Sequence, residues 1–311
     1  MTKHKGSAVS KKAWAGRKLL MPGIIFSAGC FFLAGLATQP HTEAYAMPSR
    51  TAIGSHIQKM TYELYAGGIN AVQAEFDVSY DSQDRYSLEL VAATKGFLGK
   101  LVPWSGTFKT HGWRLKDGQE RPELHKSTAI WNGEEDVKEY HYSKDGDFKS
   151  LHVFEGGQDE SPETLEDDLV QGTTDALTAT LQAMQAVSTT GLCEGEDEVF
   201  DGKRRFKLIF RHMDEEILAP TKYNIYEGVT VRCEIEVLPM SGAWHKKPRG
   251  WASIQEQGRN KGSLPTVWLA KLDEQGPAVP VKLRVKTDYG TLFMHMVGYE
   301  NGNKKIVTKT D

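Results

Sequence analysis

The chain has 311 residues, of which 39% are hydrophobic and 25% are charged, a balance typical of a globular protein with a sizeable core. The formal net charge is −3 at pH 7. An acidic chain lacks the positive field that binding a nucleic-acid backbone requires, so we expect no nucleic-acid partner.

The first 46 residues have the pattern of a secretory signal peptide. Six basic residues precede an apolar stretch at 19–36, and Ala44-Tyr45-Ala46 supplies small residues three and one positions before a cleavage point. The alternative is a retained membrane anchor, since the stretch approaches the ~20 residues that span a bilayer. Pro22 and three glycines weaken an anchor. We predict cleavage after Ala46, periplasmic localisation and no stable membrane span afterwards.

The mature chain, residues 47–311, keeps 32 basic and 40 acidic residues, a net charge of −8. It also keeps two cysteines, Cys193 and Cys233. An even pair in an exported protein predicts a disulfide, which would stabilise the fold by about 3–4 kcal/mol for a loop of this length. The alternative is two buried thiols. A metal site is not expected, because no close Cys-x-x-Cys pair is present, and no cofactor is expected either.

Alternating apolar and polar residues predict antiparallel strands in the first half. Residues 72–80 and 86–92 alternate on either side of a turn at 81–84, which is typical of a β-hairpin. Asn132-Gly133 and Asp145-Gly146 are further hairpin turns. Four more strands are expected, at 107–115, 123–131, 137–143 and 148–154.

Three segments depart from this alternation. Residues 97–104 are apolar and predict a short helix or amphipathic loop, which either plugs one end of the sheet or contacts a membrane. Residues 155–172 are acidic and predict a solvated linker. Residues 175–187 have helical periodicity, with Thr173 or Thr174 as the N-cap and Gly191 at the end.

The remainder returns to strands in a second meander, so that 47–311 is expected to be a single β-rich domain. Paired strands are predicted at 199–200 with 205–212, 221–226 with 230–237, and 281–286 with 291–299.

A basic cluster follows the turn between the first of these pairs. Asp201-Gly202 is typical of a type I′ turn, and it places Lys203, Arg204 and Arg205 just beyond the tip. Local physics favours a charged, solvated hairpin tip. The alternative is a fixed corner in which the arginines pair with carboxylates or bind an anionic group.

A second basic segment combines charge with aromatic rings. It contains Trp244, Lys246, Lys247, Arg249 and Trp251. Such a loop suits an anionic glycan or lipid head group through charge and stacking. The alternative is a solvated loop with two anchoring tryptophans.

No motif identifies a reaction, and no catalytic residue is predicted. The chain lacks a Gly-x-Ser-x-Gly elbow, a phosphate-binding Gly-x-x-x-x-Gly-Lys-Ser/Thr loop and a His-Glu-x-x-His helix. The histidines of the mature chain are too far apart in sequence for a local metal site, so each is interpreted as an ordinary surface or strand residue. They are His56, His111, His125, His141, His152, His212, His245 and His295.

Several stretches together resemble a bacterial family of exported proteins known only as a domain of unknown function. They are Cys-x5-Val-Phe-Asp-Gly-Lys-Arg-Arg-Phe (193–206), Val-x-Val-Arg-Cys (229–233), Val-Pro-Val-Lys-Leu (279–283), Tyr-Glu-Leu-Tyr-Ala-Gly-Gly-Ile (62–69) and Gly-Phe-Leu-Gly-Lys-Leu-Val-Pro-Trp (96–104). The chain is also similar to the envelope-integrity proteins of alphaproteobacteria. This resemblance implies two bent antiparallel sheets, a β-spiral or pair of half-barrels, around one central helix with an apolar interior. Residues 239–265 match no part of it.

The expected function is therefore that of a non-enzymatic periplasmic protein that supports cell-envelope integrity by binding a lipid, glycan or protein. The alternatives are a hydrolase of envelope metabolism, with an active site assembled from separate strands, and a periplasmic lipid carrier. A continuous apolar cavity would favour the carrier. A nucleophile and base within hydrogen-bond reach would favour the enzyme, and a filled interior would favour a scaffold.

Overall fold

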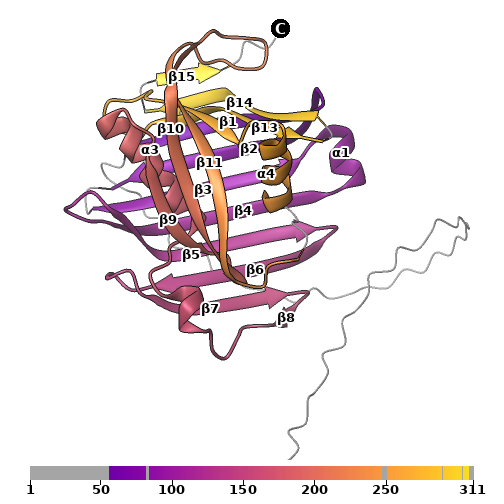
Figure 1. The fold of residues 1–311 in the computed structure, drawn as a ribbon, viewed down its shortest axis with the longest axis vertical. Coiled ribbons are helices and arrows are strands. Elements are labelled where there is room, and N and C mark those ends of the chain that lie inside the picture. Colours follow the sequence, from indigo (N-terminus) through magenta and orange to yellow (C-terminus); the bar gives the residue numbers. More distant parts are fainter. Residues whose placement is uncertain (1–55, 82–83, 247–250, 289, 303, 308–311) are drawn as a thin grey trace, which may run out of the picture. The chain divides into compact units, whose positions relative to one another are not determined.

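The computed structural model describes residues 56–81, 84–246, 251–288, 290–302 and 304–307 (Figure 1). The predicted signal peptide and its cleavage point lie outside the described residues. Among the described residues, the buried hydrophobic side chains of the core lie between Met60 and Tyr299. The described core thus lies within the predicted mature chain.

The described strands form one antiparallel sheet that is not closed into a barrel. The first meander contains β1 (His56–Ala66), β2 (Ile69–Tyr80), β3 (Arg85–Thr94), β4 (Trp104–Arg114), β5 (Glu120–Trp131), β6 (Glu134–Tyr142), β7 (Phe148–Glu155) and β8 (Gln158–Asp159). The second contains β9 (Gly195–Phe200), β10 (Arg204–Leu218), β11 (Gly228–Gly242), β12 (Thr266–Ala270), β13 (Val279–Thr287), β14 (Gly290–Asn301) and β15 (Lys304–Val307). The described residues also form four helices: α1 (Gly96–Leu101), α2 (Asp167–Val170), α3 (Ala176–Thr190) and α4 (Trp251–Asn260).

The two expected sheets are joined into one in the described part of the chain. Strand β1 pairs with β14, in a register that places Lys59 opposite Glu300, and this pairing connects the first meander to the second. The alternation of apolar and polar residues in a strand shows which side chains face the core. It does not show which distant strand will be its hydrogen-bonded neighbour. The acidic linker also contains structure that was not expected, the short elements β8 and α2.

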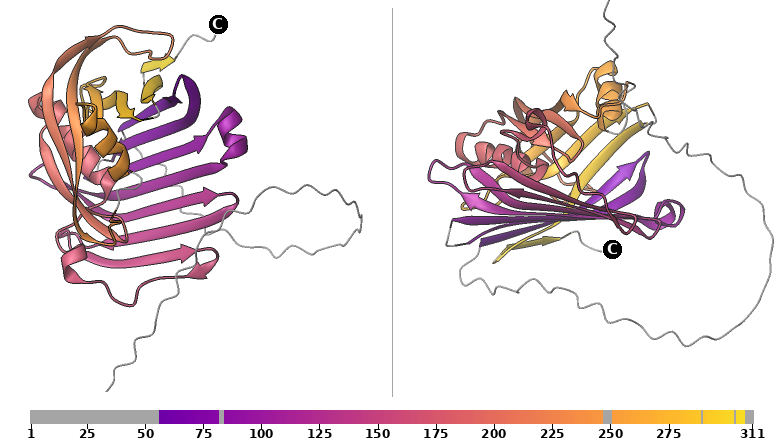
Figure 2. Two further views of the ribbon diagram at one scale, coloured as in Figure 1. Left: turned by 45° about the vertical axis from the view of Figure 1, so that its right-hand side comes forward. Right: turned by 90° about the horizontal axis from the view of Figure 1, so that it is seen from below.

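The second meander crosses the inner face of the first. Figure 1 shows β9, β10 and β11 running across β3 to β6, with α3 beside them, and the view from below in Figure 2 separates the two layers. The main core cluster draws on both layers and on α3, whose Leu181 and Met184 are fully buried. The predicted helix therefore supplies part of the core.

Three local predictions need correction. The N-cap of α3 is Asp175 rather than Thr173 or Thr174, because its carboxylate accepts hydrogen bonds from the amides of Leu177 and Thr178. The expected strand at 221–226 is a loop, because the Thr221 and Asn224 side chains accept backbone N–H bonds that a sheet would otherwise take. The α1 segment does not plug the sheet, since none of its residues is buried. Gly191 does end α3, in the left-handed conformation at φ 73°.

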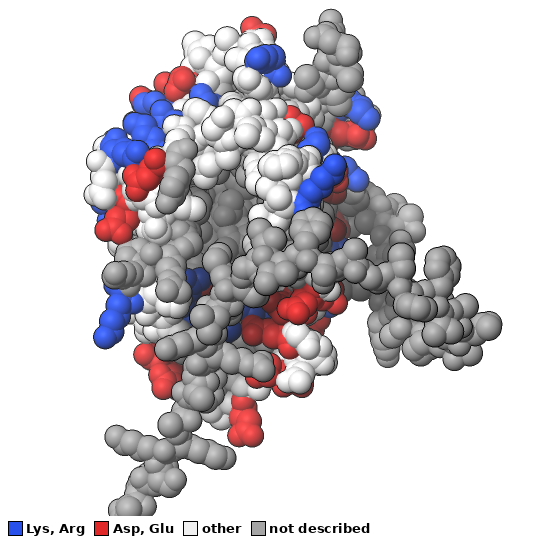
Figure 3. All heavy atoms as spheres, turned by 90° about the vertical axis from the view of Figure 1, so that its right-hand side faces the viewer, with Lys and Arg blue, Asp and Glu red and all other residues white. Residues whose placement is uncertain are grey.

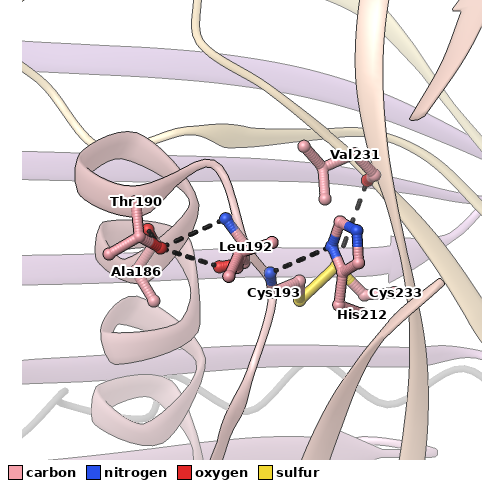
Figure 4. The surroundings of a disulfide bond; sticks show 7 residues. All are labelled: Ala186, Thr190, Leu192, Cys193, His212, Val231 and Cys233. Carbon is pink, nitrogen blue, oxygen red and sulfur yellow. Dashed lines mark hydrogen bonds between the residues drawn. A yellow bond between two sulfur atoms is a disulfide. The ribbon is translucent and has the colours of Figure 1, made fainter. Parts of the chain in front are cut away.

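The predicted disulfide is present. Cys193 follows α3 and Cys233 lies in β11, and their Cα atoms are 5.8 Å apart. Figure 4 shows the imidazole of His212 beside the bond, where its Nδ1 accepts a 3.4 Å hydrogen bond from the Cys193 amide. The disulfide thus ties the end of the core helix to the crossing layer. Among the described residues, no helix combines the length and apolar character needed to cross a membrane.

Candidate ligand-binding cavity

A cavity of about 460 Å³ lies between the inner face of the first meander and the crossing layer. Most of its lining is apolar or aromatic: Leu90, Phe108, Ala129, Tyr140, Ala176, Leu177, Val199, Phe200 and Phe206. Polar residues complete it: His125, Ser127, Asp136, Lys138, Glu155, Asp175 and Asp201. Both its volume and its mixed lining match those of small-molecule sites.

A row of small residues crosses the inner face of the first meander, and the cavity is lined by its last member, Ala129. Successive register partners across β2 to β5 are Ala74, Ala92, Gly106 and Ala129. Interior space that is not filled by large side chains is rare, because protein cores pack to crystal-like density. Residues of two separate buried clusters line the cavity, Val199 from the main one and Tyr140 and Phe200 from a smaller one. The cavity therefore marks the gap between these clusters.

A buried polar cluster reaches the cavity through His125. The His125 side chain is 12% exposed and lies 3.3 Å from the Asp175 carboxylate, which is 1% exposed. Thr110 joins them, with its hydroxyl 2.7 Å from His125 Nδ1 and 2.9 Å from Asp175 Oδ1. Asp175 also accepts a 2.6 Å bond from the Thr178 hydroxyl in addition to the two amide bonds of its N-cap. Two hydroxyl groups and two backbone amides thus donate to this one carboxylate.

These contacts assign the two ring nitrogens of His125. A carboxylate only accepts, so the single hydroxyl proton of Thr110 goes to Asp175, and Thr110 must then accept from Nδ1–H. Nε2 is left as the ring nitrogen available to a ligand. Burial lowers the pKa of His125, and the Asp175 charge opposes that shift. The site therefore offers a neutral imidazole at near-neutral pH.

The same cluster lacks the geometry of nucleophilic catalysis. Thr110 is 1% exposed. Its hydroxyl proton is directed to Asp175, so the imidazole is not placed to remove it. Tyr140, the aromatic neighbour of His125 with ring centroids 5.3 Å apart, is itself buried, and burial raises the pKa of its phenol. These groups hydrogen-bond or stack, and neither activates the other.

The predicted corner closes one wall of the cavity. Asp201 Oδ1 accepts from the amides of Lys203 and Arg204, and Asp201 Oδ2 accepts a 2.8 Å bond from Arg204 Nε. Gly202 has φ 92°, and a Cβ there would lie 2.9 Å from the Tyr140 hydroxyl. The turn therefore needs glycine both for its conformation and because it is pressed against β6.

The other two cations of the corner are also paired. Arg205 Nε donates to Glu198 at 2.7 Å, and its Nη1 donates to the carbonyl of Asp168 at 2.8 Å. Lys203 Nζ lies 3.3 Å from Glu155, which lines the cavity. The basic cluster thus has carboxylate and carbonyl partners within the chain, which agrees with the predicted fixed corner rather than with a solvated hairpin tip. Its use as an anion site is not indicated by these contacts.

The predicted basic loop contributes one residue to that corner. The Trp244 ring lies 4.9 Å from the Arg204 guanidinium carbon and its Nε1 donates to the Ser241 carbonyl at 2.9 Å. Lys246 is exposed. Lys247 and Arg249 lie outside the described residues, as does the side chain of Trp251, the first residue of α4. Trp244 therefore anchors the hairpin, and Lys246 is not among the residues that line the cavity.

A larger depression of about 670 Å³ lies elsewhere, against β1 and the loop after β12. Its lining is dominated by charged and polar residues, including His56 and Asp273, which form a 2.6 Å contact. It adjoins positions outside the described residues and lacks an apolar wall, so it has less of the character of a ligand site. In the described part of the chain, no group of three or more His, Cys, Asp or Glu side chains is arranged to hold a metal ion.

Sequence reasoning did not identify His125 and Asp175. His125 was interpreted as an ordinary strand residue, and it is 50 positions away from Asp175. The available signal was Asp175 itself, an excellent N-cap immediately before a helical pattern. Nothing local indicated that the cap would meet β5.

Comparison with known proteins finds one matching family model. A family model described as "Protein of unknown function (DUF3108)" matches residues 61–297. No curated protein and no solved structure matches the chain.

Proposed function

We propose, for a chain that belongs to the DUF3108 family of proteins of unknown function, that it binds a single-chain amphiphile in the cavity and supports the cell envelope without catalysing a reaction. The observation that carries the proposal is the cavity itself. It offers about 460 Å³ lined mainly by apolar and aromatic side chains.

The arrangement of polar groups favours an amphiphile over a pure hydrocarbon. Hydrocarbon needs no partner, whereas His125 presents a nitrogen acceptor to the cavity and Lys138 and Glu155 lie in its polar part. A hydroxyl or carboxylic acid could donate to His125 Nε2, while an acyl chain lies against Phe108 and Phe206. Hydrogen bonding by such a head group would satisfy polar atoms that are otherwise costly to bury.

An exported location supports this role. The Cys193–Cys233 disulfide is stable in oxidising compartments such as the periplasm and is rare in the cytosol. The signal-peptide pattern in residues 1–46 points the same way. We propose periplasmic localisation on these two grounds.

The cavity favours a carrier or lipid-dependent envelope protein over the other expected classes. A scaffold would have a filled interior. A hydrolase would need an activated nucleophile, and the Thr110 hydroxyl is committed to Asp175. The paired corner at Asp201–Arg205 also favours a structural role for that motif over recognition of an anionic glycan.

Fluorescence titration with 11-(dansylamino)undecanoic acid tests the proposal. Ala129→Phe fills the cavity from β5, and we expect it to weaken probe binding about tenfold or more. Thr128→Phe adds the same ring at the next residue, which alternation directs to the opposite face, and should bind like wild type. Absence of saturable binding by the wild type, or equal binding by both variants, would reject the proposal.

A further inference from the structure

Exposed apolar side chains gather where the strands of the first meander end, at the start of β2, in the connection between β3 and β4, and at the end of β5. We call Ile69, Phe97, Leu101 and Trp131 the apolar edge; their exposed fractions are 61%, 71%, 61% and 52%. Backbone bonds connect the segments: the Lys95 amide donates to the Ala71 carbonyl at 2.9 Å, and the Asn132 amide to the Pro103 carbonyl at 3.1 Å. Strand ends that are distant in sequence therefore present these side chains at the same edge.

Helix α1 holds two of them in place. The Thr94 hydroxyl accepts from the Trp104 amide at 3.0 Å and donates to the Val102 carbonyl at 2.9 Å, which closes the loop that carries the helix. Gly99 packs closely, since a Cβ there would lie 2.9 Å from the Thr94 carbonyl oxygen. The loop is thus well anchored, yet Phe97 and Leu101 face outwards. Clustered exposed apolar side chains of this kind mark interaction sites.

The apolar edge is continuous with the cavity. Trp131 comes two residues after Ala129 in β5, so its side chain lies on the same, inner face as the cavity lining. Its register partner Trp104 comes two residues before Gly106 in β4 and lies on that face as well. The two tryptophans are therefore one row beyond the cavity. A partner at this edge would therefore lie beside the end of the cavity nearest to Ala129, Asp136 and Glu155.

We infer that the apolar edge docks onto the surface of a zwitterionic phospholipid bilayer, and this inference rests on the proposed amphiphile binding because it identifies where the amphiphile enters. A short outward-facing helix with Phe and Leu, next to a Trp and to Lys95 and Lys100, has the residue types that settle at the membrane–water interface. A projecting edge needs no complementary groove when the partner is a fluid surface.

The charges favour a bilayer without strong net charge. Glu134 and Glu135 begin β6, directly after the Asn132-Gly133 turn that follows Trp131, so the lysines near α1 are offset by carboxylates. In Figure 3 the side of the molecule that carries α1 in Figure 1 shows both basic and acidic side chains, and the acidic ones predominate in the lower half. An anionic surface would attract one group of charges and repel the other.

Flotation with phosphatidylcholine vesicles tests the inference, using residues 47–311, the predicted mature chain, which contains every core residue that the structure describes. We expect the wild type to float with the vesicles and Phe97→Ser/Leu101→Ser to reduce the bound fraction about tenfold or more. Ile217→Ser/Val229→Ser is the matched control, because it removes an exposed pair on β10 and β11, 78% and 53% exposed, and should float like wild type. Circular dichroism establishes that all three proteins are folded.

Each other outcome overturns the inference. A wild type that does not float, or a control that loses binding equally, removes the apolar edge as a membrane site. A concentration-dependent dimer that Phe97→Ser/Leu101→Ser abolishes, without flotation, would assign the edge to a second copy of the chain. Binding of 11-(dansylamino)undecanoic acid in solution should be unchanged in Phe97→Ser/Leu101→Ser, so failure of docking remains distinguishable from failure of the proposed function.

Discussion

Glu120 gives the protein a pH-dependent stability that a single substitution should remove. It is the first residue of β5, is 3% exposed and pairs across the ladder with Arg114. Burial raises its pKa from 4.5 to about 7, although the Arg114 charge opposes the rise. The folded state therefore holds a proton on Glu120 at pH values where the unfolded chain has lost it.

The direction and the size of the pH effect on the free energy of unfolding follow from this pKa shift. An acid whose pKa is raised on folding stabilises the folded state fully below pH 4.5, and that stabilisation is lost as the pH rises to about 7. At about 1.36 kcal/mol per pKa unit, the loss is about 3 kcal/mol. Glu120→Gln keeps the shape and lacks the titration, so its stability relative to wild type should increase by about that amount between pH 4.5 and pH 7.5 and stay level above.

Urea unfolding of both proteins across this pH range measures the difference. All other titrating groups are common to the two proteins and cancel. Glu123→Gln is the control, because it removes a carboxylate from the same strand whose side chain is 41% exposed rather than buried. A difference curve that stays flat for Glu120→Gln, or rises equally for Glu123→Gln, would refute the reasoning.

Three further substitutions test the structural interpretation by chemical or thermal unfolding. Arg205→Ala should lower the free energy of unfolding by about 1.5–3 kcal/mol, since its 14% exposed side chain loses charge-assisted bonds, whereas Arg204→Ala, at 37% exposure, should cost less than about 1 kcal/mol; equal costs would contradict this order. Replacing Cys193 and Cys233 by serine should cost about 3–4 kcal/mol and lower the thermal midpoint, and an unchanged midpoint would show that the disulfide adds no stability. Asp175→Ala should be about 0.5–2 kcal/mol less stable than Asp175→Asn, which keeps a capping oxygen; similar stabilities would mean that the cap contributes little.

Local signals in the sequence were sufficient for much of the fold. The hairpins of the first meander follow from alternation and from turns such as Asn132-Gly133, whose two residues both have positive φ. The position of the turn at Asp201-Gly202 and the pairing of Cys193 with Cys233 were likewise predicted. The turn is not of the predicted type I′, because Gly202 has a positive φ and Asp201 does not. The turns depend on a few neighbouring residues, and the disulfide follows because the predicted mature chain has two cysteines, which can pair in one way.

Features that depend on distant pairing were not predictable in this way. The single sheet arises because β1 pairs with β14, and neither strand carries a local mark of its partner. The cavity lining is assembled from β3 to β7, α3, β9 and β10, and residues such as Phe108, Ala129 and Phe206 are unremarkable one by one. His125 similarly acquires its character only when the N-cap of α3 packs against β5.

Crystallography with 11-bromoundecanoic acid tests the central claim most directly, because the bromine atom reports the position of the acyl chain by anomalous scattering. The account predicts a bromine peak inside the cavity, among Phe108, Ala129 and Phe206, with the carboxyl group within hydrogen-bond distance of His125. A cavity that holds only ordered water at saturating ligand, or a bromine peak confined to the outer surface, would contradict it.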